Sequence, residues 1–216
     1  MDIDLISITK KTDTSAIISG DITGSGAEDN TGITGTITAT DVEGVSSYGI
    51  SVDPNNGTAT MNTTTGEWTY VPSANFFGTD QFTAIVSDNL GGTTTQVVSV
   101  TVTAVDDAAN ISGDITGSGA EDTQITGTIN ATDVEGLTDG TYYTITSDPN
   151  NGSASIDPAN GQWAYNPNTG FTGNDQFTVT VTDDLGGTKT QVVNVTVTSA
   201  SSGGGGNNNN DNNNDD

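Results

Sequence analysis

The eleven residues SGDITGSGAED occur twice in the chain, at positions 19–29 and again at 112–122. Later landmarks recur with a similar offset, so that Trp68 is followed 95 residues later by Trp163. The chain therefore contains two copies of one module, each the size of a small domain. Because this period is too long for a solenoid repeat, each copy should have its own hydrophobic core.

The two copies divide the 216 residues into five segments. We expect an N-terminal extension or the end of a preceding module at 1–16, a first module at 17–104, an acidic linker at 105–109, a second module at 110–198 and a tail at 199–216. The tail closes with GGGGNNNNDNNNDD, which offers no apolar residue to bury. We therefore expect the tail to be disordered.

Within each copy the apolar residues alternate with polar ones. Val98, Val100 and Val102 are separated by Ser99 and Thr101, and this period of two is typical of half-buried antiparallel strands. About seven short strands are predicted per copy, near 17–24, 33–40, 47–52, 57–62, 66–71, 80–87 and 94–103 in the first. The pattern predicts an all-β chain with two tandem immunoglobulin-like β-sandwich modules.

Trp68 and Trp163 stand two residues before Tyr70 and Tyr165 in the two copies. We interpret these residues as aromatic core residues of the sandwiches. A platform on which sugar rings stack is the alternative that the residues leave open.

The charge balance excludes several function classes. The chain has 28 Asp and Glu residues against 3 Lys and Arg residues, and it has no His and no Cys. Nucleic-acid binding needs basic residues, and histidine catalysis, cysteine nucleophiles, Cys/His zinc sites and disulfides need residues that are absent. The sequence contains no run of about 18 apolar residues, so we expect no membrane insertion. Residues 1–11 lack the pattern of a secretory signal, so we expect signal-independent export or a longer parent chain.

The acidic residues recur at the ends of the predicted modules. The set that we select as calcium ligands consists of Glu28, Asp80, Asp106, Asp107, Asp133, Glu135 and Asp183. Residues two apart in an extended segment point the same way, so an Asp-x-Glu segment can turn both carboxylates to one ion. Acids that gather at a junction repel one another unless a cation is present, and calcium binds six to eight oxygen atoms. We therefore predict structural Ca²⁺ at the inter-repeat junction.

Two other interpretations of the acids stay open. Asp residues favour turns and keep a protein soluble, so single members of the set could be turn residues. A glycosidase-like carboxylate pair is the sharper alternative, but both copies have the same acids without basic or aromatic residues gathered around them. We predict that the chain is not an enzyme, and we assign no catalytic residue.

Several runs resemble a known family: ISGDITGSGAED, TGTINATDVEG, NGSASIDPANGQWAYNP and NDQFTVTVTDDLGGTKTQVVNVTVT. They are similar to VCBS-type repeats, the cadherin-like and immunoglobulin-like tandem modules of large bacterial surface proteins and RTX adhesins. The resemblance implies display on the bacterial surface or secretion, extension made rigid by calcium, and a role in adhesion or biofilm formation. Its implied partners are neighbouring modules and host or surface glycans or proteins.

The resemblance also implies roles for individual acids. Glu28 is similar to the early Glu of a cadherin repeat, and Asp183 to the later Asp of the following repeat. The linker acids of cadherins correspond to Asp106 and Asp107, and their Asp-x-Asp corresponds to Asp133 and Glu135. Asp80 lies in the region of the cadherin Asp-Arg-Glu motif but matches it poorly, and the linker lacks the usual Asn-Asp-x-Pro ending.

We therefore expect a non-catalytic spacer or adhesion module of an extracellular protein. Two alternatives remain. A self-associating filament subunit would use exposed strand edges to complete a neighbouring copy. A carbohydrate-binding module would show an exposed cluster of aromatic side chains.

Overall fold

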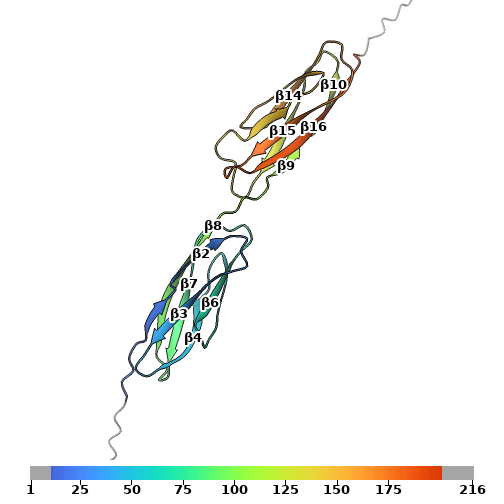
Figure 1. Ribbon diagram of the computed structural model, residues 1–216. Coiled ribbons are helices and arrows are strands. Elements are labelled where there is room, and N and C mark those ends of the chain that lie inside the picture. Colours follow the sequence, from blue (N-terminus) through green and yellow to red (C-terminus); the bar gives the residue numbers. More distant parts are fainter. Residues whose placement is uncertain (1–10, 201–216) are drawn as a thin grey trace, which may run out of the picture. The chain divides into compact units, whose positions relative to one another are not determined.

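The computed structural model describes residues 11–200, which divide into two units between Val105 and Asp106 (Figure 1). Each unit is a sandwich of two four-stranded sheets, which confirms the predicted all-β class. The strand predicted around Ile6 and Ile8 and the tail from residue 201 onwards lie outside the described residues. Within 11–200 there is no helix long and apolar enough to cross a membrane.

In unit 1 one sheet has the strand order β1-β3-β6-β5 and the other β2-β8-β7-β4. The strands are β1 (Ile17–Gly20), β2 (Thr23–Ala27), β3 (Ile33–Thr40), β4 (Val45–Val52), β5 (Gly57–Met61), β6 (Glu67–Pro72), β7 (Gly78–Asp88) and β8 (Thr93–Thr103).

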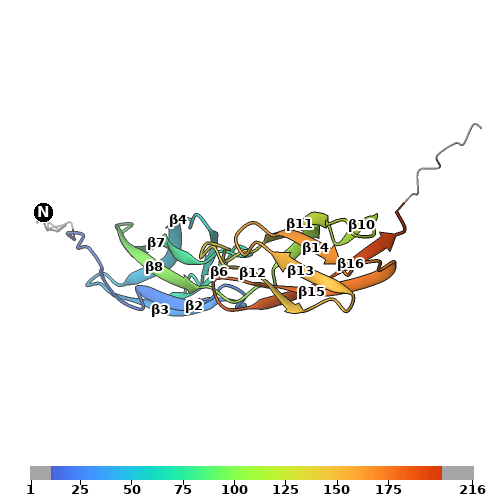
Figure 2. The same ribbon diagram turned by 90° about the horizontal axis from the view of Figure 1, so that it is seen from above.

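Unit 2 repeats this architecture with the orders β13-β14-β11-β9 and β10-β16-β15-β12. Its strands are β9 (Asn110–Gly113), β10 (Thr116–Ala120), β11 (Ile125–Thr132), β12 (Tyr143–Ser147), β13 (Gly152–Ile156), β14 (Gln162–Pro167), β15 (Gly173–Thr182) and β16 (Thr188–Thr198). The long strands β15 and β16 run side by side along this unit (Figure 2).

The alternating apolar residues build one core in each unit. Trp68 is 1% exposed and meets Phe82 edge-on at a ring-centroid distance of 5.5 Å. Trp163 and Phe177 repeat this contact at 5.5 Å in unit 2. The interpretation of the tryptophans as core residues is therefore confirmed.

Each unit has eight strands where about seven were expected, because the predicted strand at 17–24 is split in two. Gly20 has a φ of +97°, a backbone conformation that favours glycine. At this point the chain leaves one sheet and enters the other. β1 pairs antiparallel with β3, whereas β2 pairs parallel with β8. Gly113 makes the same crossing in unit 2, with a φ of +95°.

The sandwich gives each unit two distinct ends. The entry end contains the segment before the first strand, the β3–β4 loop and the β7–β8 turn, or their counterparts in unit 2. The exit end contains the β2–β3 loop and the last residues of β8 or β16. A strand of eleven residues such as β8 separates the two ends by about 35 Å.

Candidate functional site

An acidic cluster occupies the entry end of unit 2. Asp106 and Asp107 precede β9, Asp133 and Glu135 follow β11, and Asp183 follows β15. The N–H of Asp107 donates to Glu135 Oε2 at 3.1 Å. The structure thus brings together five of the seven predicted ligands.

Asp183 is fixed in this cluster by its own loop. Its side chain is buried, and Oδ1 accepts the N–H groups of Leu185 and Gly187 at 2.9 Å each. A methyl group at Gly187 would overlap the carboxylates of both Asp106 and Asp183. The absent side chain therefore leaves the space in which these two carboxylates meet.

Three carboxylate oxygens of the cluster are enclosed without a hydrogen-bond partner among the described residues. They are Oδ2 of Asp107, Oδ2 of Asp133 and Oε1 of Glu135. An enclosed carboxylate oxygen that has no hydrogen-bond partner is unfavourable. Carboxylate oxygens that have lost water are ligands for a hard cation such as Ca²⁺.

The electrostatics of the cluster indicate excess negative charge. Burial raises the pKa of Asp106, and the neighbouring charges of Asp183, Asp133 and Asp107 raise it further. Burial also raises the pKa of Glu135, although the N–H of Asp107 partly offsets this. Both carboxyls would therefore gain from a cation that neutralises the cluster.

The cluster is not a closed cage of acidic side chains. Within residues 11–200 no three acidic side chains lie close enough together to hold a metal ion by themselves. Calcium commonly completes its shell with backbone carbonyl and water oxygens. The donor atoms in unit 2 fit that mode of binding.

Unit 1 contains a second set of acids that we did not predict as ligands: Asp13, Asp41, Glu43 and Asp88. A methyl group at Gly92 would overlap the carboxylates of Asp13 and Asp88. Oδ2 of Asp41 is enclosed without a partner. Burial and the charge of Asp88 raise the pKa of Asp13. The offset of 92 to 95 residues between the copies was the signal that could have identified this set.

The two clusters differ at one position. Thr14 stands where unit 2 has Asp107, and its hydroxyl donates to Glu43 Oε2. This hydrogen bond lowers the pKa of Glu43, whereas the pKa of the equivalent Glu135 is raised. The cluster of unit 1 therefore has one acid fewer and a better-satisfied glutamate.

Glu28 lies at the exit end of unit 1, away from the entry-end acids of that unit. Its side chain is 4% exposed, and Oε1 accepts the N–H of Val105 at 2.8 Å. Its Oε2 is enclosed without a partner. Glu28, directly after β2, is thus hydrogen-bonded to the last residue of the unit, and its second carboxylate oxygen has no partner.

Asp80 lies near the start of β7, apart from the two entry-end clusters, and its carboxylate accepts four hydrogen bonds. Oδ1 accepts the N–H groups of Asn55 and Gln81, and Oδ2 accepts the N–H of Asn56 and the hydroxyl of Tyr70. These bonds fill the roughly four acceptor positions of a carboxylate. Burial alone would raise the pKa of Asp80, but these donors lower it. Asp80 therefore fixes the backbone of the loop before β5.

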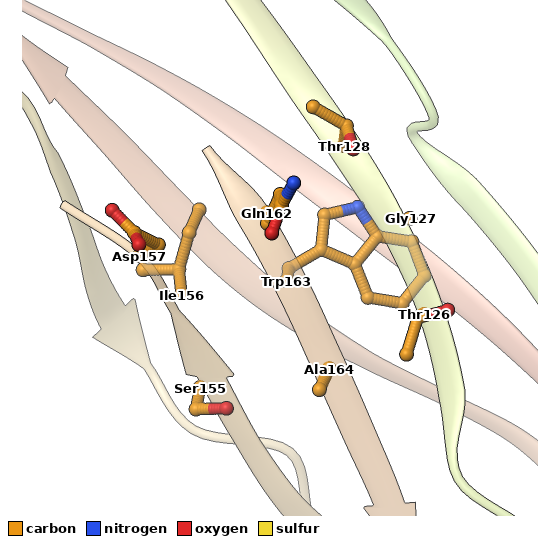
Figure 3. Close-up of a pocket in the computed structure, with 9 residues that line it drawn as sticks. All are labelled: Thr126, Gly127, Thr128, Ser155, Ile156, Asp157, Gln162, Trp163 and Ala164. Carbon is orange, nitrogen blue, oxygen red and sulfur yellow. The ribbon is translucent and has the colours of Figure 1, made fainter. Parts of the chain in front are cut away.

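The tryptophans do not form a stacking platform. A hollow of about 580 Å³ lies on sheet β13-β14-β11-β9, and Trp163 borders it (Figure 3). The indole is only 2% exposed and packs against Gly127. Its Nε1–H donates to the carbonyl of Asp114 at 3.0 Å. This side chain is therefore not presented to a ligand.

The sequence profile of the bacterial Ig domain family matches residues 12–101 and 106–196. The chain belongs to the bacterial Ig domain family. No curated protein matches this bacterial Ig chain. Such domains are typically non-catalytic modules of surface or secreted proteins.

Solved structures of cadherin repeats are similar to the two bacterial Ig modules. Extracellular cadherin domains 3–6 of protocadherin gamma B2 match with a TM-score of 0.58 and 13% identity over 85% of this chain and 47% of that chain. Human CDH23 EC21-23 matches with a TM-score of 0.58 and 18% identity, over 82% of this chain and 67% of that chain. Drosophila N-cadherin EC1-4 matches with a TM-score of 0.59 and 14% identity, over 84% of this chain and 49% of that chain.

These similarities concern the fold alone, and the chain spans about half the length of the first of these structures. Together with the family match, they confirm the resemblance to tandem immunoglobulin-like and cadherin-like repeats.

The raised pKa values of Asp13 and Asp106 predict a pH dependence of the cation-free modules. A carboxyl whose pKa is raised by folding stabilises the fold at low pH, and this contribution is lost as the pH rises through the folded pKa. Asp106→Asn in unit 2 should therefore raise the cation-free melting temperature more at about pH 7 than at about pH 4, because the carboxyl that it replaces is charged at the higher pH and more protonated at the lower. Saturating calcium should reduce this difference. An effect of the substitution that is the same at both pH values would contradict the prediction.

Gly187→Ala should weaken calcium binding in unit 2. The new methyl group overlaps Asp106 and Asp183, and the exposed Asp106 side chain can swing away more easily than the buried Asp183. We expect an affinity loss of about tenfold, equivalent to about 1.4 kcal/mol, measured by titration calorimetry. Thr190→Ala, at an exposed position of β16 three residues further along the chain, is the control and should leave the affinity unchanged.

Proposed function

We propose that each bacterial Ig module binds structural calcium at its entry end, and that the chain is a stiffened, non-catalytic spacer of an extracellular bacterial surface or secreted protein. One observation carries the calcium proposal. In both modules two aspartate carboxylates lie where the side chain of a glycine would otherwise be. Next to them are acidic side chains with an enclosed oxygen that has no hydrogen-bond partner. The repetition in two independently built units supports a shared role for these acids.

In unit 2 the ion would be held by Asp106 and Asp183, and backbone carbonyl and water oxygens would complete its shell. Bound calcium would also offset the negative charge of the neighbouring Asp107, Asp133 and Glu135. In unit 1, Asp13, Asp41, Glu43 and Asp88 would play the same part. Because Thr14 replaces an acid there, we expect the site in unit 1 to be the weaker one.

The spacing along the chain gives the ion a mechanical role. Glu28 holds the N–H of Val105 at the exit end of unit 1, and Asp106 is the next residue. An ion bound to Asp106, next to Asp107, would therefore restrain the two linker residues that directly follow Val105. Bending between consecutive modules would be restricted, as an extended spacer requires.

Titration calorimetry with Ca²⁺ tests this proposal directly. The double variant Asp106→Asn and Asp133→Asn should lose the tighter class of sites, with an affinity decrease of at least about tenfold. Asp157→Asn is a suitable control, because Asp157 is an exposed turn residue that accepts N–H groups of Ala159 and Asn160. Absence of calcium binding to the unchanged chain, or unaltered binding to the double variant, would refute the proposed site.

A further inference from the structure

Each module has a polar hollow at the same place on its longer-stranded sheet. In unit 2 it measures about 410 Å³ and is lined by Asn150, Asn151, Asn174, Asp175, Gln176, Asn194, Val195 and Thr196. In unit 1 it measures about 450 Å³ and is lined by Asn55, Asn56, Thr79, Asp80, Gln81, Ser99, Val100 and Thr101. Residues with amide and hydroxyl side chains therefore make up most of the lining in both modules.

The wall of the hollow is preorganised by a buried aspartate. In unit 2, Asp175 is 7% exposed and accepts the N–H groups of Asn150, Asn151 and Gln176 at 2.7–3.0 Å. The hydroxyl of Tyr165 donates to it at 3.0 Å. These bonds fix the backbone of the loop that carries the asparagines, so their amides project from a rigid support.

The hollow lies over β15 and β16, the two central strands of the sheet order β10-β16-β15-β12. At the hollow β16 is paired with both β10 and β15, and β15 is paired with β16. The pairing of β12 with β15 begins only at Thr178, and before that point the loop of Asn150 and Asn151 donates hydrogen bonds to Asp175. Side chains and this loop, more than a free backbone edge, are therefore what the hollow presents to a ligand.

The charges around the hollow exclude ionic ligands. The acceptor positions of Asp175 are already filled, so it offers little to a cation. On β15 and β16 the one basic residue is Lys189, which is about 17 Å along the strand from Asn194. A polyanion would meet a strongly acidic chain with no cation to pair with.

We propose that these hollows bind neutral glycans. A carboxamide has two donor hydrogens and a carbonyl acceptor, which matches the adjacent hydroxyls of a sugar ring. Gln176 and Asn194 lie directly opposite each other across β15 and β16 and present two amides side by side. Because the hollow is polar and open, binding at one module should be weak, and repetition along tandem modules would provide avidity. Calcium binding is not required for this recognition.

Native electrophoresis in gels containing soluble polysaccharides tests the proposal. The panel contains dextran, laminarin, pullulan, galactomannan and xyloglucan as neutral chains, with alginate as the acidic comparison. At least one neutral polysaccharide should retard the two-module chain, and alginate should not. Competition by short oligosaccharides of the same composition would show that single sugar units, and not only the polymer, are recognised.

Alanine variants test where the glycan binds. One double variant is Gln176→Ala with Asn194→Ala in unit 2, and the other is Gln81→Ala with Ser99→Ala in unit 1. The two residues of each pair lie directly opposite each other on neighbouring strands. Together they should reduce the retardation at least threefold. The matched control is Thr128→Ala with Gln162→Ala, a register pair on the other sheet, which should have no effect. The proposal fails if no neutral polysaccharide retards the chain, if alginate retards it equally, or if the control pair causes the same loss.

Discussion

Removing calcium should lower the melting temperature of the two-module chain by about 10–20 °C. An ion present at about 100 times its dissociation constant stabilises the folded state by about 2.7 kcal/mol. In a domain of this size each kcal/mol shifts the melting temperature by about 4–8 °C. The effect should be large because the ion relieves the repulsion around Asp106 and Asp13, whose pKa values are raised in its absence.

Scanning calorimetry in calcium and in EGTA provides the measurement, with magnesium as the comparison. Magnesium demands a tighter octahedral shell, so it should restore only a small part of the stability. The weaker cluster of unit 1 should give that module the smaller shift, which single-module chains would resolve. Identical melting curves in calcium and in EGTA would rule out a structural ion.

Replacing Asp175 with alanine should destabilise unit 2 by about 3 kcal/mol without changing its calcium affinity. The substitution leaves three N–H groups without their acceptor, whereas the Tyr165 hydroxyl keeps its hydrogen bond to the carbonyl of Asn151. Each unpaired buried group costs about 1–3 kcal/mol. Water entering from the adjacent hollow should satisfy some of these donors, which keeps the loss below the full sum. Burial and the bond to Asp175 also raise the pKa of Tyr165 to about 12.

Urea unfolding of the single unit, paired with calcium titration, checks this prediction. Tyr165→Phe is the graded comparison and should cost only about 1 kcal/mol, because it removes one hydrogen bond. Asp183→Asn should show the opposite profile, with a loss of calcium affinity greater than its loss of cation-free stability. A decrease in calcium affinity for Asp175→Ala would show that this aspartate contributes to the ion site after all.

The fold was predictable from sequence because its physical signals are local and repeated. Alternating valines such as Val98 and Val100 define strands that have one buried face, and the 95-residue offset defines two cores. The division of the first strand was missed, because SGDITGSG reads as one polar stretch. Only the positive φ of Gly20 and the change of pairing partner reveal two strands in different sheets.

The candidate site was predictable in part for a related reason. Acids that follow strands at the same end could be grouped with Asp183, because strand ends fix where the following residues lie. The hydrogen bonds of Asp80 could not be predicted, because sequence does not show which backbone N–H groups a carboxylate accepts. Asp13, Asp41, Glu43 and Asp88 were not among the predicted ligands, although the repeat places the same residue types in unit 1.

The parallel pairing of β2 with β8 has a consequence for a chain under tension. These strands lie near the two ends of the module sequence, and five residue pairs join them, from Thr23 with Ser99 to Ala27 with Thr103. A pull on both termini would draw β2 and β8 in opposite directions along their axes. Their hydrogen bonds would then be loaded together in shear and could not be peeled apart one at a time. β10 and β16 repeat this arrangement, so each module contains a clamp that resists rupture along the direction in which a tethered spacer is pulled.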